Sequence, residues 1–260
     1  MTTRLDIAMV ERGLAPTRNK AQALIMAGDV LIDGRNAQKA GESVSESSAI
    51  TIVAGPRFVS RGGEKLDHAL SAFQIDLEGK ICADIGASTG GFTDAMLQRG
   101  AARVFAIDVG YGQIALELRN DNRVVVMDRT NARHLDSLSD PVDFTSIDAS
   151  FISLSKLFPA VLRISKPESS LVALIKPQFE AGKGEVGKHG VVRDIAVHRR
   201  VLAEVVERAA EHELYLAGLT ASPLKGPAGN IEFLGYFRRG GYEPIDTHAA
   251  IESALDGAPR

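Results

Sequence analysis

The sequence contains one cysteine and no tryptophan among its 260 residues. A lone Cys82 can form neither an internal disulfide nor a zinc site, which favours a reducing compartment. No apolar run approaches the roughly 18 residues that a membrane span needs, and the first residues lack the apolar core of a secretory signal. These absences predict a cytoplasmic protein and disfavour a membrane protein.

The charge balance also lacks any general sign of nucleic-acid binding. The 30 lysines and arginines are offset by 33 aspartates and glutamates, which gives a net charge of -3, whereas domains that bind phosphate backbones are usually strongly basic. Any RNA-binding surface must therefore be local. The composition, 45% apolar and 24% charged, excludes disordered and collagen-like chains and allows one large domain plus a small one.

Residues 1–54 have the pattern of a small α+β domain. Helical spacing predicts helices over 4–12 and 17–26, and the Asp33-Gly34 pair predicts a hairpin turn. This order of elements resembles the S4-type RNA-binding domain. The resemblance implies that basic side chains contact an RNA backbone, and the candidates are Arg4, Arg18, Lys20 and Arg35. The alternative interpretation is a small helical cap whose charges are merely solvated.

A linker is predicted over 55–63, because Pro56 restricts the chain and the paired glycines 62 and 63 loosen it. From residue 64 to 260, apolar runs of strand length alternate with helical stretches. This alternation predicts a doubly wound α/β domain with a mostly parallel, seven-stranded, Rossmann-like sheet. The predicted strands are 81–85, 104–108, 124–127, 142–147, 171–175, 214–219 and 231–237, and the clearest helices are 64–73 and 196–212.

A glycine-rich turn follows the first of these strands, where such folds bind nucleotide-type ligands. Ser88 occupies the place of the middle glycine of the dinucleotide fingerprint, which disfavours a nicotinamide dehydrogenase. Asp108 ends the next strand, where an acidic side chain accepts hydrogen bonds from ribose hydroxyls. The turn resembles the first motif of class I S-adenosylmethionine methyltransferases. The resemblance implies a cofactor site made of Asp84, Gly86, Ser88, Thr89, Gly90, Gly91, Phe92, Asp108, Asp128 and Arg129.

Polar residues also follow two later strands. Asp148 and Lys176 stand at strand ends that face the ligand crevice of an open α/β sheet. A lysine directly after the apolar run 171–175 is costly to bury unless it is paired, and Asp148 is its obvious partner. The two side chains are therefore predicted to meet beside the cofactor.

With these motifs the chain resembles, over nearly its whole length, the TlyA family of S4-domain-containing ribosomal RNA 2'-O-methyltransferases related to the FtsJ type. The matching segments are 60–65, 86–93, 108–113, 148–154, 176–180 and 229–232. The resemblance implies a catalytic tetrad of Lys65, Asp148, Lys176 and Glu232, with Lys176 nearest the ribose hydroxyl. It also implies a cytidine of 23S RNA in the 50S subunit as target and, in some members, a cytidine of 16S RNA in the 30S subunit. Loss of such methylation goes with capreomycin resistance in the family.

Further RNA contacts are predicted outside the first domain. The resemblance places them in the linker at Arg57, Phe58 and Arg61, with Phe58 in place of a family tryptophan, and a glycine-rich loop offers Lys183 and Lys188 to phosphates. The alternative for the loop is a plain surface segment with solvated lysines. No histidine, cysteine and carboxylate spacing indicates a metal. A haemolysin and an inactive RNA-binding module are the rival functions; nothing in the sequence supports the former physically, and the intact tetrad disfavours the latter.

Overall fold

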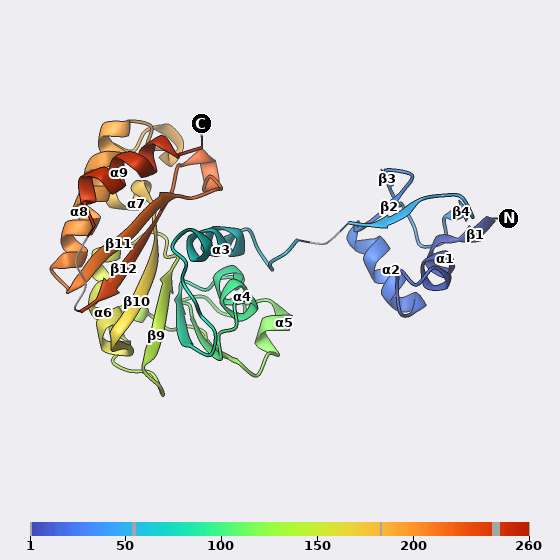
Figure 1. Cartoon of the computed structure of the whole chain (residues 1–260), viewed down its shortest axis with the longest axis horizontal. Helices are drawn as coiled ribbons and strands as arrows, with labels where there is room; N and C mark the ends of the chain where they lie inside the picture. The colour runs from blue at the N-terminus through green and yellow to red at the C-terminus, as the bar shows by residue number, and fades with distance from the viewer. Residues whose placement is uncertain (1, 54–55, 183, 241–244, 260) are drawn as a thin grey trace. The chain divides into compact units, whose positions relative to one another are not determined.

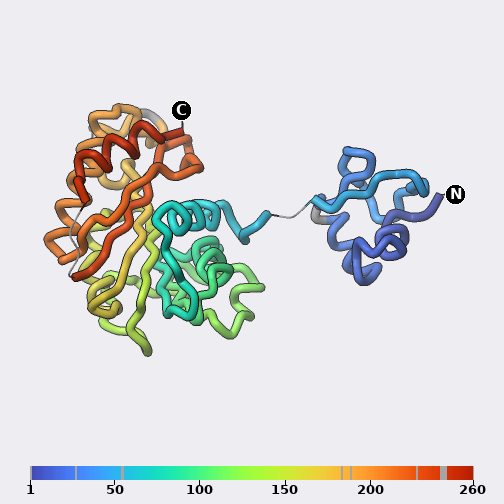
Figure 2. Tube along the Cα trace, viewed as in Figure 1, coloured from blue at the N-terminus to red at the C-terminus, as the bar shows by residue number. Residues whose placement is uncertain are grey.

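A computed structural model describes residues 2–53, 56–182, 184–240 and 245–259. The chain divides into two compact units, Met1–Arg57 and Phe58–Arg260, each with its own hydrophobic core (Figure 1). In Figure 2, the trace of the small unit is blue, and that of the large unit runs from cyan to red.

The small unit contains the two helices that the sequence predicts. They are α1 (Leu5–Glu11) and α2 (Arg18–Ala27), and the Thr17 hydroxyl caps α2 by accepting a hydrogen bond from the Lys20 amide at 3.2 Å. Each helix buries one apolar face in a shared core. The residues of that core include Leu5, Met9, Ala21, Ile25, Val30 and Ile32.

Short antiparallel strands complete the small unit, and the predicted hairpin is confirmed. Asp33 and Gly34 have φ angles of 51° and 82°, as a two-residue hairpin turn requires. One sheet has the order β3-β2-β5 and another pairs β1 with β4. The bounds are β1 (Thr2–Arg4), β2 (Val30–Ile32), β3 (Arg35–Asn36), β4 (Ser43–Ser45) and β5 (Ile50–Ile52).

The large unit is built on a seven-stranded sheet in the order β11-β12-β10-β9-β6-β7-β8. The strands are parallel except β12, which runs antiparallel to both of its neighbours. This confirms the predicted mostly parallel sheet. The bounds are β6 (Ile81–Ile85), β7 (Arg103–Ile107), β8 (Val124–Met127), β9 (Val142–Ile147), β10 (Ser165–Ile175), β11 (Leu214–Ala221) and β12 (Phe233–Arg239).

Helices cover both faces of the sheet, as a doubly wound fold requires (Figure 1). One face packs a core under α3 and α4, and the other packs a core under α6, α8 and α9. The helices are α3 (Gly62–Ala72), α4 (Gly91–Gln98), α5 (Leu116–Arg119), α6 (Phe158–Ile164), α7 (Pro177–Glu180), α8 (Ile195–Ala210) and α9 (Thr247–Asp256).

Glycines 63 and 91 allow helices α3 and α4 to pack closely at their first turns. A Cβ atom on Gly91 would lie 2.2 Å from the Ser60 hydroxyl, and one on Gly63 would lie 2.3 Å from the Phe58 ring. The paired glycines 62 and 63 therefore belong to a packed helix start, where the sequence predicted a loosened linker. This packing fixes the first turn of α3, which carries Lys65.

Asp84 is a carboxylate in the core of the large unit. Its side chain is fully buried, and its two oxygens accept hydrogen bonds from the hydroxyls of Thr93 at 2.7 Å and Ser146 at 3.1 Å. Burial disfavours the charged form and raises the pKa of Asp84 to about 7, against the lowering effect of both hydroxyls.

This raised pKa predicts a pH-dependent stability. Between about pH 4 and 7 the folded protein retains the Asp84 proton that the unfolded chain releases. The contribution of Asp84 to the free energy of unfolding is therefore full below pH 4 and is lost as the pH rises through 7. The effect is of the order of 4 kcal/mol in total. Urea unfolding at several pH values should show a flatter pH dependence for Asp84→Asn, whereas Glu117→Gln, at an exposed carboxylate of α5, should follow the wild type. Equal pH slopes for Asp84→Asn and wild type would contradict this assignment.

Candidate active site

The loops that follow β6 and β9 touch at the carboxyl ends of these strands. Gly86 comes directly after β6 with a φ of +87°, a conformation that side chains disfavour. A Cβ atom there would lie 2.5 Å from the carbonyl oxygen of Asp148, which follows β9. Glycine at position 86 is what permits this contact.

A cavity of about 370 Å³ lies beside this contact. It brings together the four residues of the predicted tetrad and most of the glycine turn. Its lining consists of Ser60, Arg61, Gly62, Lys65, Gly86, Ala87, Ser88, Thr89, Gly91, Phe92, Asp148, Ser150, Lys176 and Glu232.

The tetrad forms two lysine–carboxylate pairs. The Lys176 amine lies 2.5 Å from Asp148 Oδ1 and donates a hydrogen bond to the Ser150 hydroxyl at 3.0 Å. The Lys65 amine donates to Glu232 Oε2 at 2.5 Å. Lys65, Lys176 and Glu232 are 8%, 9% and 1% exposed. Such buried charges require partners, and here both pairs line one cavity.

Glu232 has one oxygen that Lys65 does not bind. Its Oε1 is buried and has no hydrogen-bond partner in the described part of the chain. Gly226 lies against this oxygen, because a Cβ atom at position 226 would fall 2.1 Å from Oε1. The Glu232 carboxylate thus faces Lys65 with one oxygen and Gly226 with the other, at the wall of the first cavity.

A second cavity of about 400 Å³ adjoins the first and shares Gly86, Ser88, Asp148 and Ser150 with it. Asp108 lines it and holds the glycine turn, since its oxygens accept hydrogen bonds from the amides of Gly110 at 2.6 Å and Ser88 at 2.8 Å. Sequence reasoning missed much of this lining, including Val109, Gln113, Thr130, Asn131, Ala132, Ile152 and Leu157.

Several residues predicted for the cofactor site lie elsewhere. Asp84 is in the core, as described above, and Gly90 lies at the start of α4 against Leu118. Asp128 accepts a hydrogen bond from Arg119 at 3.1 Å, and the Arg129 guanidinium lies 4.3 Å from the centre of the Tyr111 ring. None of Asp84, Gly90, Asp128 and Arg129 lines either cavity. The segment after β8 does line the second cavity, but at Thr130, two residues after Asp128.

The predicted RNA contacts of the linker and the glycine-rich loop have mixed outcomes. Arg61 is exposed and lines the first cavity, and Arg57 is exposed as well. Phe58, by contrast, is 3% exposed and packs in the core of the large unit, which leaves no free ring for RNA. Lys183 and the side chain of Lys188 lie outside the described residues.

In the small unit, the predicted basic residues differ in their surroundings. Lys20 is exposed, and Arg35 forms an ion pair with Glu42 at 2.6 Å. Arg4 and Arg18 both bind the carboxylate of Asp6.

Sequence reasoning also missed an exposed aromatic residue beside the tetrad. Phe151 is 91% exposed, has a φ of +63° and lines the second cavity. Its ring centre lies 5.0 Å from that of Phe179, and the Lys176 amine lies 5.9 Å from the Phe179 ring. Exposure and a strained backbone are unusual for phenylalanine, and residues held this way cluster at functional sites.

The sheet order, the glycine turn and the cavity beside it define a methyltransferase. In agreement, residues 58–239 match the FtsJ-like methyltransferase family and residues 3–50 match the S4 domain. The chain belongs to the TlyA family of FtsJ-like methyltransferases.

Two curated relatives and one solved structure illustrate this membership. The chain is 48% identical over 239 residues to the 16S/23S rRNA (cytidine-2'-O)-methyltransferase TlyA of Mycobacterium tuberculosis, with 90% of this chain and 89% of the relative covered. It is 30% identical over 247 residues to the 23S rRNA (cytidine-2'-O)-methyltransferase TlyA of Campylobacter jejuni, with 88% and 96% covered. A solved structure from Streptococcus thermophilus has a TM-score of 0.75 at 39% identity, with 98% of this chain and 94% of that chain covered.

Two features are absent from the described residues. None of their helices combines the length and the apolar character that crossing a membrane requires. Within the same ranges, no three or more histidine, cysteine, aspartate or glutamate side chains gather in a way that could hold a metal ion.

Proposed function

We propose that this enzyme transfers a methyl group from S-adenosylmethionine to the ribose 2'-hydroxyl of a cytidine in 23S rRNA and also in 16S rRNA. The observation that carries the proposal is the pairing of Lys176 with Asp148 and of Lys65 with Glu232 on one cavity beside the glycine turn. The relative from Mycobacterium tuberculosis, named for both RNAs, supports the two substrates. Such substrates predict a cytoplasmic enzyme.

The residues present fit S-adenosylmethionine. Gly86 leaves room at the turn that a Cβ atom would fill, and the two adjoining cavities suit a ligand with an amino acid part and a nucleoside part. We assign the nucleoside to the cavity lined by Asp108, Asn131 and Ala132, with Asp108 accepting from the ribose. When bound, the cofactor supplies a methyl group activated by a sulfonium charge.

The chain's own residues must then orient a ribose hydroxyl and handle its proton. Lys176 is the group assigned to the 2'-hydroxyl oxygen, where its amine accepts the proton or stabilises the developing negative charge. Asp148 and Ser150 fix the direction of the Lys176 amine. Lys65 holds Glu232 in place, and we assign Glu232 to the positioning of the target ribose at this cavity.

The substrate class follows from features around this cavity. An exposed ring such as Phe151 offers a surface on which a base turned out of an RNA stem can stack. The exposed Arg61 at the cavity supplies positive charge for the phosphate backbone, and the S4 domain adds exposed basic side chains such as Lys20.

Transfer of labelled methyl from S-adenosylmethionine to separated, unmethylated 30S and 50S subunits tests the proposal. We expect label in the RNA of both subunits. Label in 50S RNA alone would remove the 16S part of the proposal. Absence of label from both, with folded protein that binds the cofactor and RNA, would favour the inactive binding module. Lysis of erythrocytes by the purified protein without methyl transfer would favour the haemolysin.

A further inference from the structure

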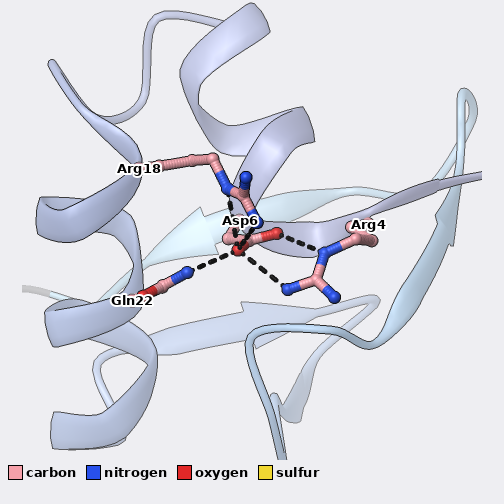
Figure 3. A network of polar contacts seen from close by, with 4 residues as sticks. All are labelled: Arg4, Asp6, Arg18 and Gln22. Atoms are coloured by element: carbon pink, nitrogen blue, oxygen red, sulfur yellow. Dashed lines mark hydrogen bonds and ion pairs between the residues drawn. The ribbon is translucent and has the colours of Figure 1, made fainter.

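Asp6 of the S4 domain binds two arginines at once (Figure 3). The Arg4 guanidinium donates from Nε to Oδ1 and from Nη2 to Oδ2, both at 3.0 Å. Arg18 donates from Nε to Oδ2 at 3.2 Å, and the Gln22 amide donates to the same oxygen at 2.7 Å. The contacts join the end of β1, helix α1 and helix α2.

The charges in this cluster do not cancel. Two guanidiniums and one carboxylate leave a formal charge of +1, and the carboxylate is fully buried while the side chains of Arg4 and Arg18 are 48% and 54% exposed. Solvent therefore meets the positive groups and not the negative one. Hydrogen bonds from Arg4, Gln22 and Arg18 lower the pKa of Asp6 well below its usual range, so the carboxylate stays charged at any physiological pH.

The cluster differs from the other arginines of the same domain. Arg35 has a one-to-one ion pair with Glu42, and Arg12 donates to the backbone carbonyls of Ser45 and Ser48 at 2.8 and 2.7 Å. In contrast, Arg4 and Arg18 bind Asp6 through Nε and Nη2, and no hydrogen bond from either Nη1 group is found within the described ranges. The Nη1 groups of Arg4 and Arg18 can therefore donate hydrogen bonds to a ligand.

We propose that Asp6 is a positioning residue that holds Arg4 and Arg18 as a fixed pair of guanidiniums for RNA phosphates, so that removal of its negative charge weakens RNA binding. A free arginine loses rotamer freedom when it binds a phosphate, and Asp6 has already restricted both side chains. Planar guanidiniums are suited to phosphate oxygens. This inference rests on one part of the proposed function, the binding of RNA by the S4 domain, and not on methyl transfer.

Asp6→Asn in the full chain tests the inference, with binding to a generic RNA hairpin measured over a series of salt concentrations. We expect affinity to fall about fivefold and the salt dependence to weaken by about one phosphate contact. Glu11→Gln is the matched control, because it removes one negative charge from an exposed position of α1. It should bind RNA at least as tightly as the wild type.

Arg4→Lys gives a second variant in case Asp6→Asn unfolds the S4 domain. It preserves the charge on a half-exposed side chain and removes the guanidinium that forms two hydrogen bonds with Asp6. We therefore expect RNA affinity to fall about threefold. Unchanged hairpin affinity and salt slope in either folded variant would overturn the inference. Hairpin binding by the wild type without methyl transfer to either ribosomal subunit would instead overturn the proposed function and leave this inference standing.

Discussion

Lys176→Ala should lower the rate of methyl transfer about 10³-fold while S-adenosylmethionine still binds. The amine of Lys176 is 2.5 Å from Asp148 and lies on the cavity that also contains the glycine turn. Its removal takes away the group assigned to the ribose hydroxyl and leaves the turn in place. Single-turnover methyl transfer and calorimetric cofactor binding measure the two effects separately.

Lys166→Ala is the matched control for Lys176→Ala. Lys166 belongs to β10, the strand that Lys176 directly follows, and it pairs with an aspartate, Asp143, at 2.6 Å. Its side chain is 42% exposed and lines neither cavity of the active site. We expect wild-type methyl transfer from it. Lys176→Arg separates the two chemical roles: activity near that of the wild type would assign charge stabilisation, since an arginine does not release its proton. Methyl transfer by Lys176→Ala within tenfold of the wild type would contradict the role of Lys176.

The second large effect is expected for Gly86→Ala, which should weaken cofactor binding about 100-fold. Its Cβ atom would overlap the Asp148 carbonyl oxygen, and the residue would have to keep a φ of +87°. The left-handed conformation alone costs about 1–2 kcal/mol, and the overlap adds a displacement of the loop that carries Asp148. Methyl transfer should be lost even at saturating cofactor, because Asp148 orients Lys176.

Gly79→Ala separates backbone strain from the overlap. Gly79 has a φ of +69°, and a Cβ atom there meets nothing within 4 Å. It precedes β6, at the end of the strand opposite to Gly86. We expect about 1 kcal/mol lower stability and unchanged cofactor affinity. Equal cofactor affinity in Gly86→Ala and wild type would show that the turn does not hold the cofactor.

The sheet could be predicted almost completely because its strands are buried on both faces and appear as apolar runs. Strands β6, β8 and β9 have the predicted bounds. Strand β10 begins at Ser165, six residues before the predicted 171, because residues 165–170 are largely polar and show no strand pattern. The segment is held by contacts distant in sequence, among them the Arg239 guanidinium, which donates to the Ser165 carbonyl at 3.2 Å, and the pairing of Ser165 with Val142.

The site could be predicted where a residue stands at the end of a buried strand, as Asp148 and Lys176 do. A position at a strand end does not by itself determine the direction of a side chain. Asp84 and Asp108 both lie at strand ends, yet Asp84 points into the core toward Thr93, whereas Asp108 lines a cavity. Phe58 lies in the core because Gly63 offers it room, which the sequence alone does not show.

The most direct test of the central claim is nucleoside mass spectrometry of 50S RNA after reaction with the enzyme and S-adenosylmethionine. The proposed function predicts a methyl group on the ribose of a cytidine, so the product should be 2'-O-methylcytidine, absent when Lys176→Ala replaces the wild type. A methyl group on the base of any nucleoside, with no 2'-O-methylcytidine, would contradict the account.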